Sequence, residues 1–172
     1  MRLAEMLPLK QLFGLVKGSH RKASDSILRG LPPEENRRDP IWLLAVAEDQ
    51  ELLRTLEEIA RSCNWKLARV LNVNGAVKTL ESEPIRLVVL DHDPHGQDWR
   101  IAMRRFYMLP DPVCVFVASR VADRYMWDEV VRNHGYDVFP KPLRRDEVIR
   151  SVELAWYWRA WERQWTGDRK RG

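Results

Sequence analysis

Acidic side chains follow two of the most apolar segments of the chain. In the stretch "RLVVLDHD" Asp91 and Asp93 come directly after a continuous apolar run, and in "IWLLAVAED" Glu48 and Asp49 do the same. A carboxylate at the end of a buried parallel strand lies where open α/β sheets place their chemistry. Such a group can be a nucleophile, a ligand of a metal ion or only the residue that opens a loop.

A lysine follows a further apolar segment, in "YDVFPKP", where Lys141 comes just after the candidate strand. Several carboxylates with one ammonium group suit a hard divalent cation, because Mg²⁺ prefers oxygen ligands and keeps several waters. The ammonium group would balance the charge of a phosphoryl group. A carboxylate beside Mg²⁺ can attack phosphorus and form an aspartyl-phosphate, so this pattern indicates phosphoryl chemistry.

The elements that must position these groups alternate regularly from residue 41 onward. Apolar or alternating segments predict five strands, and residues at helical spacing predict five helices. We expect strands at 41–47, 66–73, 85–91, 112–119 and 136–142, and helices at 49–65, 74–82, 99–109, 122–135 and 144–165. This alternation predicts the α/β class, with a doubly wound five-stranded parallel sheet of order 2-1-3-4-5 and helices on both faces.

Length and charge indicate one domain with appendages. We divide the 172 residues into an N-terminal amphipathic segment (1–18), a polar linker (19–40), the α/β domain (41–158) and a Trp-rich helix end with a basic tail (159–172). Residues 1–40 hold eight Lys and Arg against five Asp and Glu, whereas 41–158 hold sixteen against eighteen. The excess positive charge thus lies at the ends, where it more often aids solubility than binds nucleic acid, so a nucleic-acid partner is not expected.

Nothing in the sequence indicates a membrane span or an oxidising compartment. The apolar runs are too short to cross a bilayer, and charged residues with Pro8 interrupt the first segment, so it does not resemble a signal peptide. Cys63 and Cys114 form neither a disulfide framework nor a metal motif. A reducing, cytoplasmic setting is therefore predicted.

Three motifs in the correct order make residues 41–158 resemble a response-regulator receiver domain, the family of the chemotaxis regulator with its flavodoxin-like fold. They are "AEDQELLR" after the first strand, "LVVLDHD" at the third and "YDVFPKPLRRDEV" at the fifth. The resemblance implies a single-domain protein of a two-component phosphorelay that is not an enzyme. It would accept a phosphoryl group from a histidine kinase or phosphotransfer protein and signal by protein contact.

The resemblance also implies a role for each residue of the site. Asp91 would be the phosphoacceptor. Asp49, with Glu48 in support, would hold Mg²⁺ together with Asp91 and the backbone carbonyl of Asp93. Lys141 would bind the phosphoryl oxygens.

Three positions depart from the family's pattern. Alignment of "PVCVFVA" places Val117 where a Thr or Ser normally binds the phosphoryl group, with Ser119 two residues later in the following loop. Val138 stands where an aromatic ring usually moves inward on activation, and the Pro of "DHDPHG" comes one residue early. These departures leave open an alternative, a pseudo-receiver that is not phosphorylated and acts as a docking module. "DHDP" also resembles the motif of haloacid-dehalogenase-like phosphatases, but two α/β units precede it, so that reading is remote.

Two further features are a pair of histidines near Asp91 and the apolar stripes of the last helix. His92 and His95 lie beside the site, just after Asp91, but two histidines in a loop are usually solvated, and zinc is not predicted. In the last helix one apolar stripe should pack on the sheet: Val148, Ile149, Val152, Ala155 and Trp156. A second stripe needs cover, either from residues 9–16 or from a partner such as a second copy: Leu154, Trp158, Trp161 and Trp165.

Overall fold

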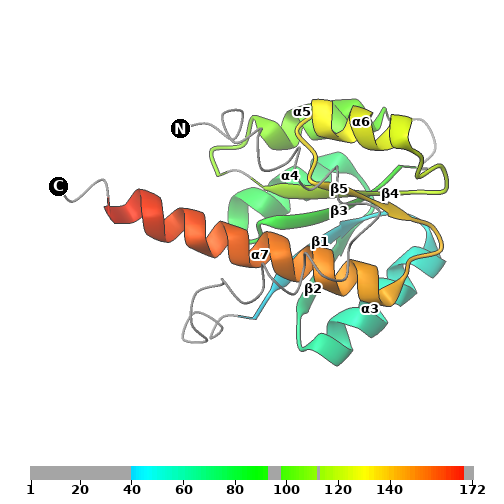
Figure 1. Cartoon of the computed structure of the whole chain (residues 1–172), viewed down its shortest axis with the longest axis horizontal. Helices are drawn as coiled ribbons and strands as arrows, with labels where there is room; N and C mark the ends of the chain where they lie inside the picture. Colours follow the sequence, from blue (N-terminus) through cyan, green and yellow to red (C-terminus); the bar gives the residue numbers. More distant parts are fainter. Residues whose placement is uncertain (1–39, 93–97, 112, 169–172) are drawn as a thin grey trace. The chain divides into compact units, whose positions relative to one another are not determined.

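The computed structural model describes residues 40–92, 98–111 and 113–168, with the backbone alone for Trp158 and residues 160–168. Strands and helices alternate, as predicted (Figure 1). The strands are β1 (Trp42–Val46), β2 (Lys66–Val70), β3 (Leu87–Asp91), β4 (Cys114–Ser119) and β5 (Asp137–Pro140). The helices are α3 (Gln50–Cys63), α4 (Val73–Ser82), α5 (Trp99–Tyr107), α6 (Arg124–Arg132) and α7 (Arg145–Asp168). All strand pairs are parallel and the sheet order is β2-β1-β3-β4-β5, which confirms the predicted fold class and topology.

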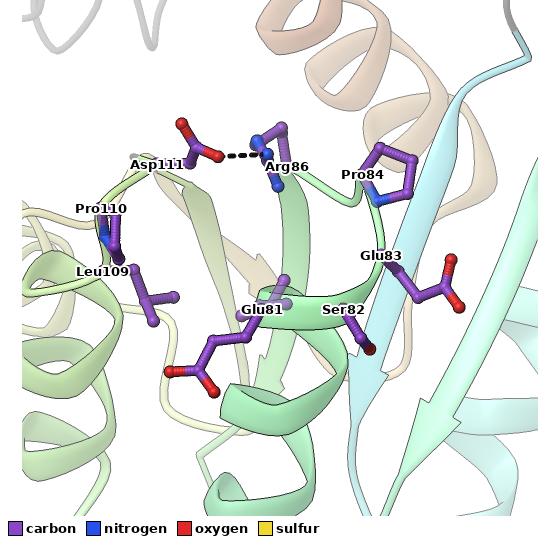
Figure 2. A pocket seen from close by; sticks show the side chains of 9 residues that line it. Glu81, Ser82, Glu83, Pro84, Arg86, Leu109, Pro110 and Asp111 are labelled. Atoms are coloured by element: carbon purple, nitrogen blue, oxygen red, sulfur yellow. Dashed lines mark hydrogen bonds and ion pairs between the residues drawn. The ribbon is translucent and has the colours of Figure 1, made fainter.

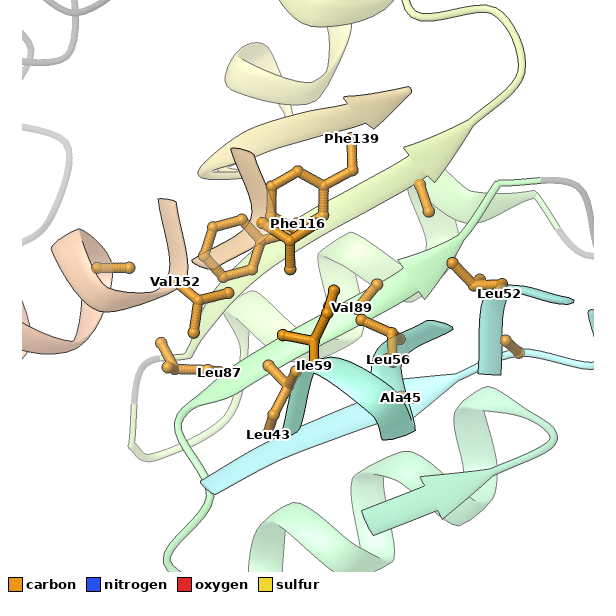
Figure 3. Close-up of a cluster of buried hydrophobic side chains, with 14 of the residues drawn as sticks. Leu43, Ala45, Leu52, Leu56, Ile59, Leu87, Val89, Phe116, Phe139 and Val152 are labelled. Carbon is orange, nitrogen blue, oxygen red and sulfur yellow. The ribbon is translucent and has the colours of Figure 1, made fainter. Parts of the chain in front are cut away.

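The sheet separates two apolar layers because successive side chains of a strand point to opposite faces. In β3, Leu87 and Val89 join the layer that contains residues of α3 and α7. Val88 and Leu90 join the layer that contains residues of α4, α5 and α6. Figure 3 shows the first layer, in which Val152 of α7 and Ile59 of α3 lie over the central strands. A strand buried on both faces is the physical reason for the continuous apolar run in β3.

Helix α7 packs through the predicted first stripe. Val148, Val152 and Ala155 are buried, and Ile149 and Trp156 are partly buried against the same layer. The helix continues to Asp168, so the boundary drawn at residues 158 and 159 falls within it.

The covering of the second stripe stays a prediction. Leu154 is half-buried, whereas the side chains of Trp158, Trp161 and Trp165 lie outside the described part of the structure. The segments 1–18 and 19–39 lie outside it as well.

Two element ends differ from the predicted ones for local reasons. Strand β2 stops at Val70 because Asn72 caps α4, its side chain accepting the N–H of Gly75 at 2.9 Å. Helix α6 ends in two reversed hydrogen bonds, from His134 N–H to Val131 O and from Gly135 N–H to Val130 O. This pairing is a Schellman motif.

The residue with left-handed backbone in that motif is His134, with φ 65°, and not Gly135, the last residue of the predicted helix. Gly135 is needed for another reason. A Cβ atom there would lie 2.9 Å from Met103 Cε and would collide with Val130.

None of the described helices is long and apolar enough to cross a membrane.

Candidate functional site

The carboxyl ends of the strands bring the predicted acids and the lysine to one edge of the sheet. Asp91 is the last residue of β3, Ser119 is the last residue of β4, and Lys141 follows the last residue of β5. Asp49 lies between β1 and α3, where it caps the helix. Parallel strands all end at the same edge, so four separate segments contribute to one cluster.

Lys141 links the two carboxylates at the centre of this edge. Its Nζ lies 2.5 Å from Oδ1 of Asp91 and 3.1 Å from Oδ2 of Asp49. The side chains of Lys141 and Asp91 are only 7% and 3% exposed. An ammonium group at that depth must be paired, because an isolated charge is costly to remove from water. The structure therefore brings together Asp49, Asp91 and Lys141, as the sequence predicts.

Asp49 has a second task at the start of α3. Its Oδ1 accepts the N–H groups of Glu51 and Leu52 at 2.9 and 3.1 Å, which closes the first turn of the helix. These contacts lower the pKa of Asp49 below its ordinary value of 3.8: the Leu52 N–H is the largest cause, burial opposes it, and Lys141 adds to it. The carboxylate is therefore held in the charged form that a cation requires.

The donor chemistry of the edge suits Mg²⁺. Asp49 and Asp91 supply carboxylate oxygens, and one or two carboxylates with several waters is a common way to hold this ion. Within the described ranges there is no group of three or more His, Cys, Asp or Glu side chains that could hold a metal. Glu48 is exposed beside the cluster. Asp93, whose carbonyl is the remaining predicted ligand, and His95 lie outside the described residues.

Strand β4 contributes Ser119 to the edge, which corrects the sequence interpretation. Val117 is fully buried in the interior of β4, where it lies opposite Leu90 of β3 and Val138 of β5 and belongs to the apolar layer over α4, α5 and α6. Ser119 is the last residue of the strand and not part of the loop, and Ala118, the residue before it, is the register partner of Asp91. The prediction that Ser119 lies in the following loop is therefore wrong, and its hydroxyl is present at this edge. The alignment of Val117 with the phosphoryl-binding position stays a prediction.

Among the described residues, His92 lies at the site although the sequence interpretation set it aside. It is half-buried, and its ring Nδ1 lies 3.3 Å from Ser119 Oγ, so the expectation that it is simply solvated is wrong. The pattern of residue types gave no signal for this contact. Only the register of β3 against β4 places the residue after Asp91 beside the end of the next strand.

Strand β5 carries Val138, and not an aromatic residue, at the position where receiver domains usually have a movable ring. Val138 is buried in the apolar layer beside Val117. The neighbouring Phe139 instead stacks on Phe116, with ring centroids 4.9 Å apart and an interplanar angle of 7°. Both rings belong to the opposite layer, where they fix β5 against β4.

A shallow hollow lies at the other edge of the sheet, where β3 and β4 begin (Figure 2). Arg86 and Asp111 form an ion pair of 2.6 Å across it, and Glu81, Glu83 and Pro110 are among its lining residues. None of the residues of the carboxylate–lysine cluster contributes to this hollow, so it is separate from the candidate site.

Comparison with known proteins supplies a fold. No protein-family model matches the sequence, and no curated protein does. Among solved structures, the signal receiver domain of a response regulator from Bermanella marisrubri matches with a TM-score of 0.61 and 18% identity, covering 68% of this chain and 98% of that one. The receiver domain of an HD domain-containing protein from Pseudomonas fluorescens matches with a TM-score of 0.61 and 15% identity, covering 68% and 94%.

A third match comes from Saccharomyces cerevisiae. It is the receiver domain of a downstream response regulator, solved together with a histidine phosphotransfer signaling protein, with a TM-score of 0.59 and 13% identity. It covers 67% of this chain and 88% of that one. These likenesses show that about two thirds of the chain has the fold of response-regulator receiver domains.

Proposed function

We propose that this chain, with its receiver-domain fold, accepts a phosphoryl group on Asp91 and passes the signal on by protein contact. The observation that carries the proposal is the position of Lys141 Nζ between the carboxylates of Asp91 and Asp49 at the carboxyl edge of the sheet. The donor would be the phosphohistidine of a kinase or a phosphotransfer protein. We place the chain in a cytoplasmic two-component phosphorelay, as a signalling module and not as an enzyme.

Each residue has a chemical role in that transfer. A carboxylate oxygen of Asp91 attacks phosphorus, the phosphorus–nitrogen bond of the donor imidazole breaks, and the imidazole leaves with the bonding electron pair. Lys141 stabilises the phosphoryl oxygens as negative charge spreads over them. Ser119 offers a hydroxyl at the end of β4 as a further donor to those oxygens.

The charge of the cluster explains why a cation belongs to this proposal. Asp49, Asp91 and Lys141 together carry one net negative charge, which disfavours the approach of an anionic phosphoryl donor. Mg²⁺, held by Asp49 and Asp91 with the carbonyl of Asp93 as the proposed third ligand, would reverse that sign and neutralise the transferring group. The lowered pKa of Asp49 keeps its carboxylate charged to a more acidic pH than an ordinary aspartate.

The partner class follows from the same chemistry. The receiver domain from Saccharomyces cerevisiae was solved with a histidine phosphotransfer protein, and it shares the fold described here. We extend that kind of partner to this chain. Association of two copies through Trp158, Trp161 and Trp165 remains a separate prediction.

The transfer can be tested with phosphoramidate, a small donor that contains a phosphorus–nitrogen bond. The protein with Mg²⁺ should gain one phosphoryl group by intact mass spectrometry, and Asp91→Asn should not. Asp111→Asn is the matched control, because Asp111 is an exposed carboxylate at the opposite edge of the sheet. Phosphorylation that survives Asp91→Asn would place the acceptor elsewhere, and removal of Mg²⁺ by a chelator should abolish the gain.

One observation favours a second candidate, the pseudo-receiver that only docks. Val138 is buried among apolar neighbours and has no ring that could change position. A wild-type protein that gains no phosphoryl group from phosphoramidate and shows no response to beryllofluoride with Mg²⁺ would establish this second candidate over the first.

A further inference from the structure

We propose that His92 is a positioning residue for Ser119: its ring holds the hydroxyl on the loop after β4 and so opposes its transfer to a phosphoryl group on Asp91. The inference rests on the proposed function and adds a specific control of the same site. It concerns a residue to which the resemblance assigns no role and which is not part of the carboxylate–lysine cluster.

The hydroxyl of Ser119 is held by three contacts at a fully buried position. Its Oγ accepts the N–H of Val121 at 3.1 Å and lies 3.3 Å from the carbonyl oxygen of Val121. It also lies 3.3 Å from Nδ1 of His92. Ser119 has no measurable exposure, so water does not readily replace these partners.

The protonation of the ring follows from counting donors and acceptors. A serine hydroxyl has one proton and two acceptor sites. With hydrogen on Nδ1 of His92, the hydroxyl accepts from that N–H and from the N–H of Val121, and donates its own proton to the carbonyl of Val121. With hydrogen on the other ring nitrogen, two acceptors would compete for one proton. The first tautomer satisfies the hydroxyl together with the N–H and the carbonyl of Val121, and buried polar groups are generally satisfied.

The ring of His92 is itself fixed from two sides. The backbone N–H of His92 donates to the carbonyl of Ala118 at 2.8 Å, which continues the pairing of β3 and β4 one step beyond Asp91. The ring centroid lies 6.0 Å from that of Trp99 at an interplanar angle of 55°. Trp99 is 5% exposed and begins α5, so the ring position is set by the sheet and by a buried helix start.

A competition follows from this geometry. The hydroxyl of Ser119 can donate to a phosphoryl group on Asp91 only if it leaves its present partners, His92 and Val121. Removal of the His92 contact should therefore favour the hydroxyl turned toward Asp91 over the hydroxyl in its present position by about three- to tenfold, the effect expected for one net neutral hydrogen bond. Asn is the conservative replacement for His92, because its amide nitrogen can donate to the hydroxyl in place of Nδ1. Leu has no donor and removes the contact.

The experiment titrates beryllofluoride, a mimic of the phosphoryl group, in the presence of Mg²⁺ and follows bound fluoride by ¹⁹F NMR. His92→Leu should lower the half-saturating concentration about three- to tenfold, and His92→Asn should remain close to wild type. In a Ser119→Ala background, His92→Leu should have no further effect, because the hydroxyl that it releases is absent.

The state without beryllofluoride supplies an independent readout. Ser119→Ala should shift the ¹⁵N resonance of His92 Nδ1, and His92→Leu should speed amide exchange of Val121. The inference is overturned if His92→Leu has the same half-saturating beryllofluoride concentration as wild type, or if the effect of His92→Leu persists in the Ser119→Ala background. It is also overturned if Ser119→Ala leaves the ¹⁵N resonance of His92 Nδ1 unchanged. A wild-type protein that binds no beryllofluoride overturns the proposed function and this inference with it. If instead wild type and His92→Leu bind beryllofluoride equally well, only the inference about His92 fails and the proposed function stands.

Discussion

At the scale of single residues, Asp49 combines two roles that substitutions can separate. Its Oδ1 caps α3, and its Oδ2 contacts Lys141. Asn is as good a helix cap as Asp, whereas Ala is a poor one. We expect Asp49→Ala to lower the free energy of unfolding by about 1 kcal/mol relative to Asp49→Asn.

Both variants should bind Mg²⁺ much more weakly than wild type, since each removes a carboxylate. Trp99 is the reporter to use: it lies near His92 at the carboxyl edge, whereas Trp42 begins β1 at the other edge. Mg²⁺-dependent fluorescence that survives in Asp49→Asn would show that the ion binds elsewhere.

Val117 and Ser119 illustrate what a sequence alignment could not decide. The resemblance predicts a phosphoryl-binding position on β4, but the register of β4 against β3 depends on packing between strands distant in sequence. In the structure Val117 faces Val138 within an apolar layer. Val117→Thr should therefore bury a hydroxyl without a suitable site, lower stability by about 1–3 kcal/mol in denaturant unfolding, and leave the beryllofluoride titration unimproved. A tighter titration in Val117→Thr would support the alignment of Val117 with the phosphoryl-binding position.

At the scale of elements, the end of α6 depends on a glycine that has no unusual backbone angle of its own. Gly135 lies against Val130 and Met103, and any side chain there would have to displace them. We expect Gly135→Ala to cost about 1–3 kcal/mol in thermal or denaturant unfolding.

Gly75 is the matched control within α4. A Cβ atom there would meet the side chain of Val70 at an ordinary 3.4 Å, and a helical Ala is more favourable than Gly. Gly75→Ala should therefore be neutral or stabilising by up to about 1 kcal/mol. Equal losses in both variants would contradict the steric account of Gly135.

Helices α5 and α6 are joined by an ion pair whose stabilising effect depends on pH. Arg100 donates to Glu129 at 2.9 Å, and Arg132 contacts the same carboxylate at 3.1 Å. The hydrogen bond from Arg100 is the largest cause that lowers the pKa of Glu129 below its ordinary value of 4.5, with burial opposing it. A lowered native pKa stabilises the fold fully above the ordinary value and loses that contribution as the pH falls through the native value.

Glu129→Gln should therefore be less stable than wild type at neutral pH, and the difference should shrink as the pH drops below about 4.5. Unfolding in denaturant at several pH values measures this, with the exposed Glu58→Gln as control. If the stability difference between wild type and Glu129→Gln stays constant with pH, the charge of Glu129 is not its cause.

The elements themselves were predictable because their patterns are local. Five strands and five helices appear in the predicted order, and the apolar stripe of α7 packs as expected. The cluster of Asp49, Asp91 and Lys141 was predictable too, because parallel strands end at one edge. What could not be predicted depends on contacts across the sheet: the depth of Ser119, the ring of His92 beside it, and the left-handed His134 before Gly135.

At the scale of the whole molecule, the expected response to phosphorylation is local. Ser119 lies directly before the loop that leads to α6, so a hydroxyl that changes partners should alter residues 119–124 first. Val138 has neither a ring nor a polar group with which to pass the change to β5. Hydrogen exchange with beryllofluoride and Mg²⁺ should therefore change in this loop and the first turn of α6, with little change along β5 and α7. Broad changes in α7 would show that another route exists.

The length of α7 has a mechanical consequence. At 24 residues it measures about 36 Å, whereas strands of four to six residues span roughly 13–20 Å. Figure 1 shows its far end, drawn in red, extending away from the strands. The helix is held by Val148, Val152 and Ala155, so a tilt of about 5° about Val152 would carry its far end, about 24 Å away, by about 2 Å. Any small motion of the helix on its buried layer, whatever its cause, would thus be largest at this tip, which makes the tip the most sensitive place at which to measure whether α7 stays still.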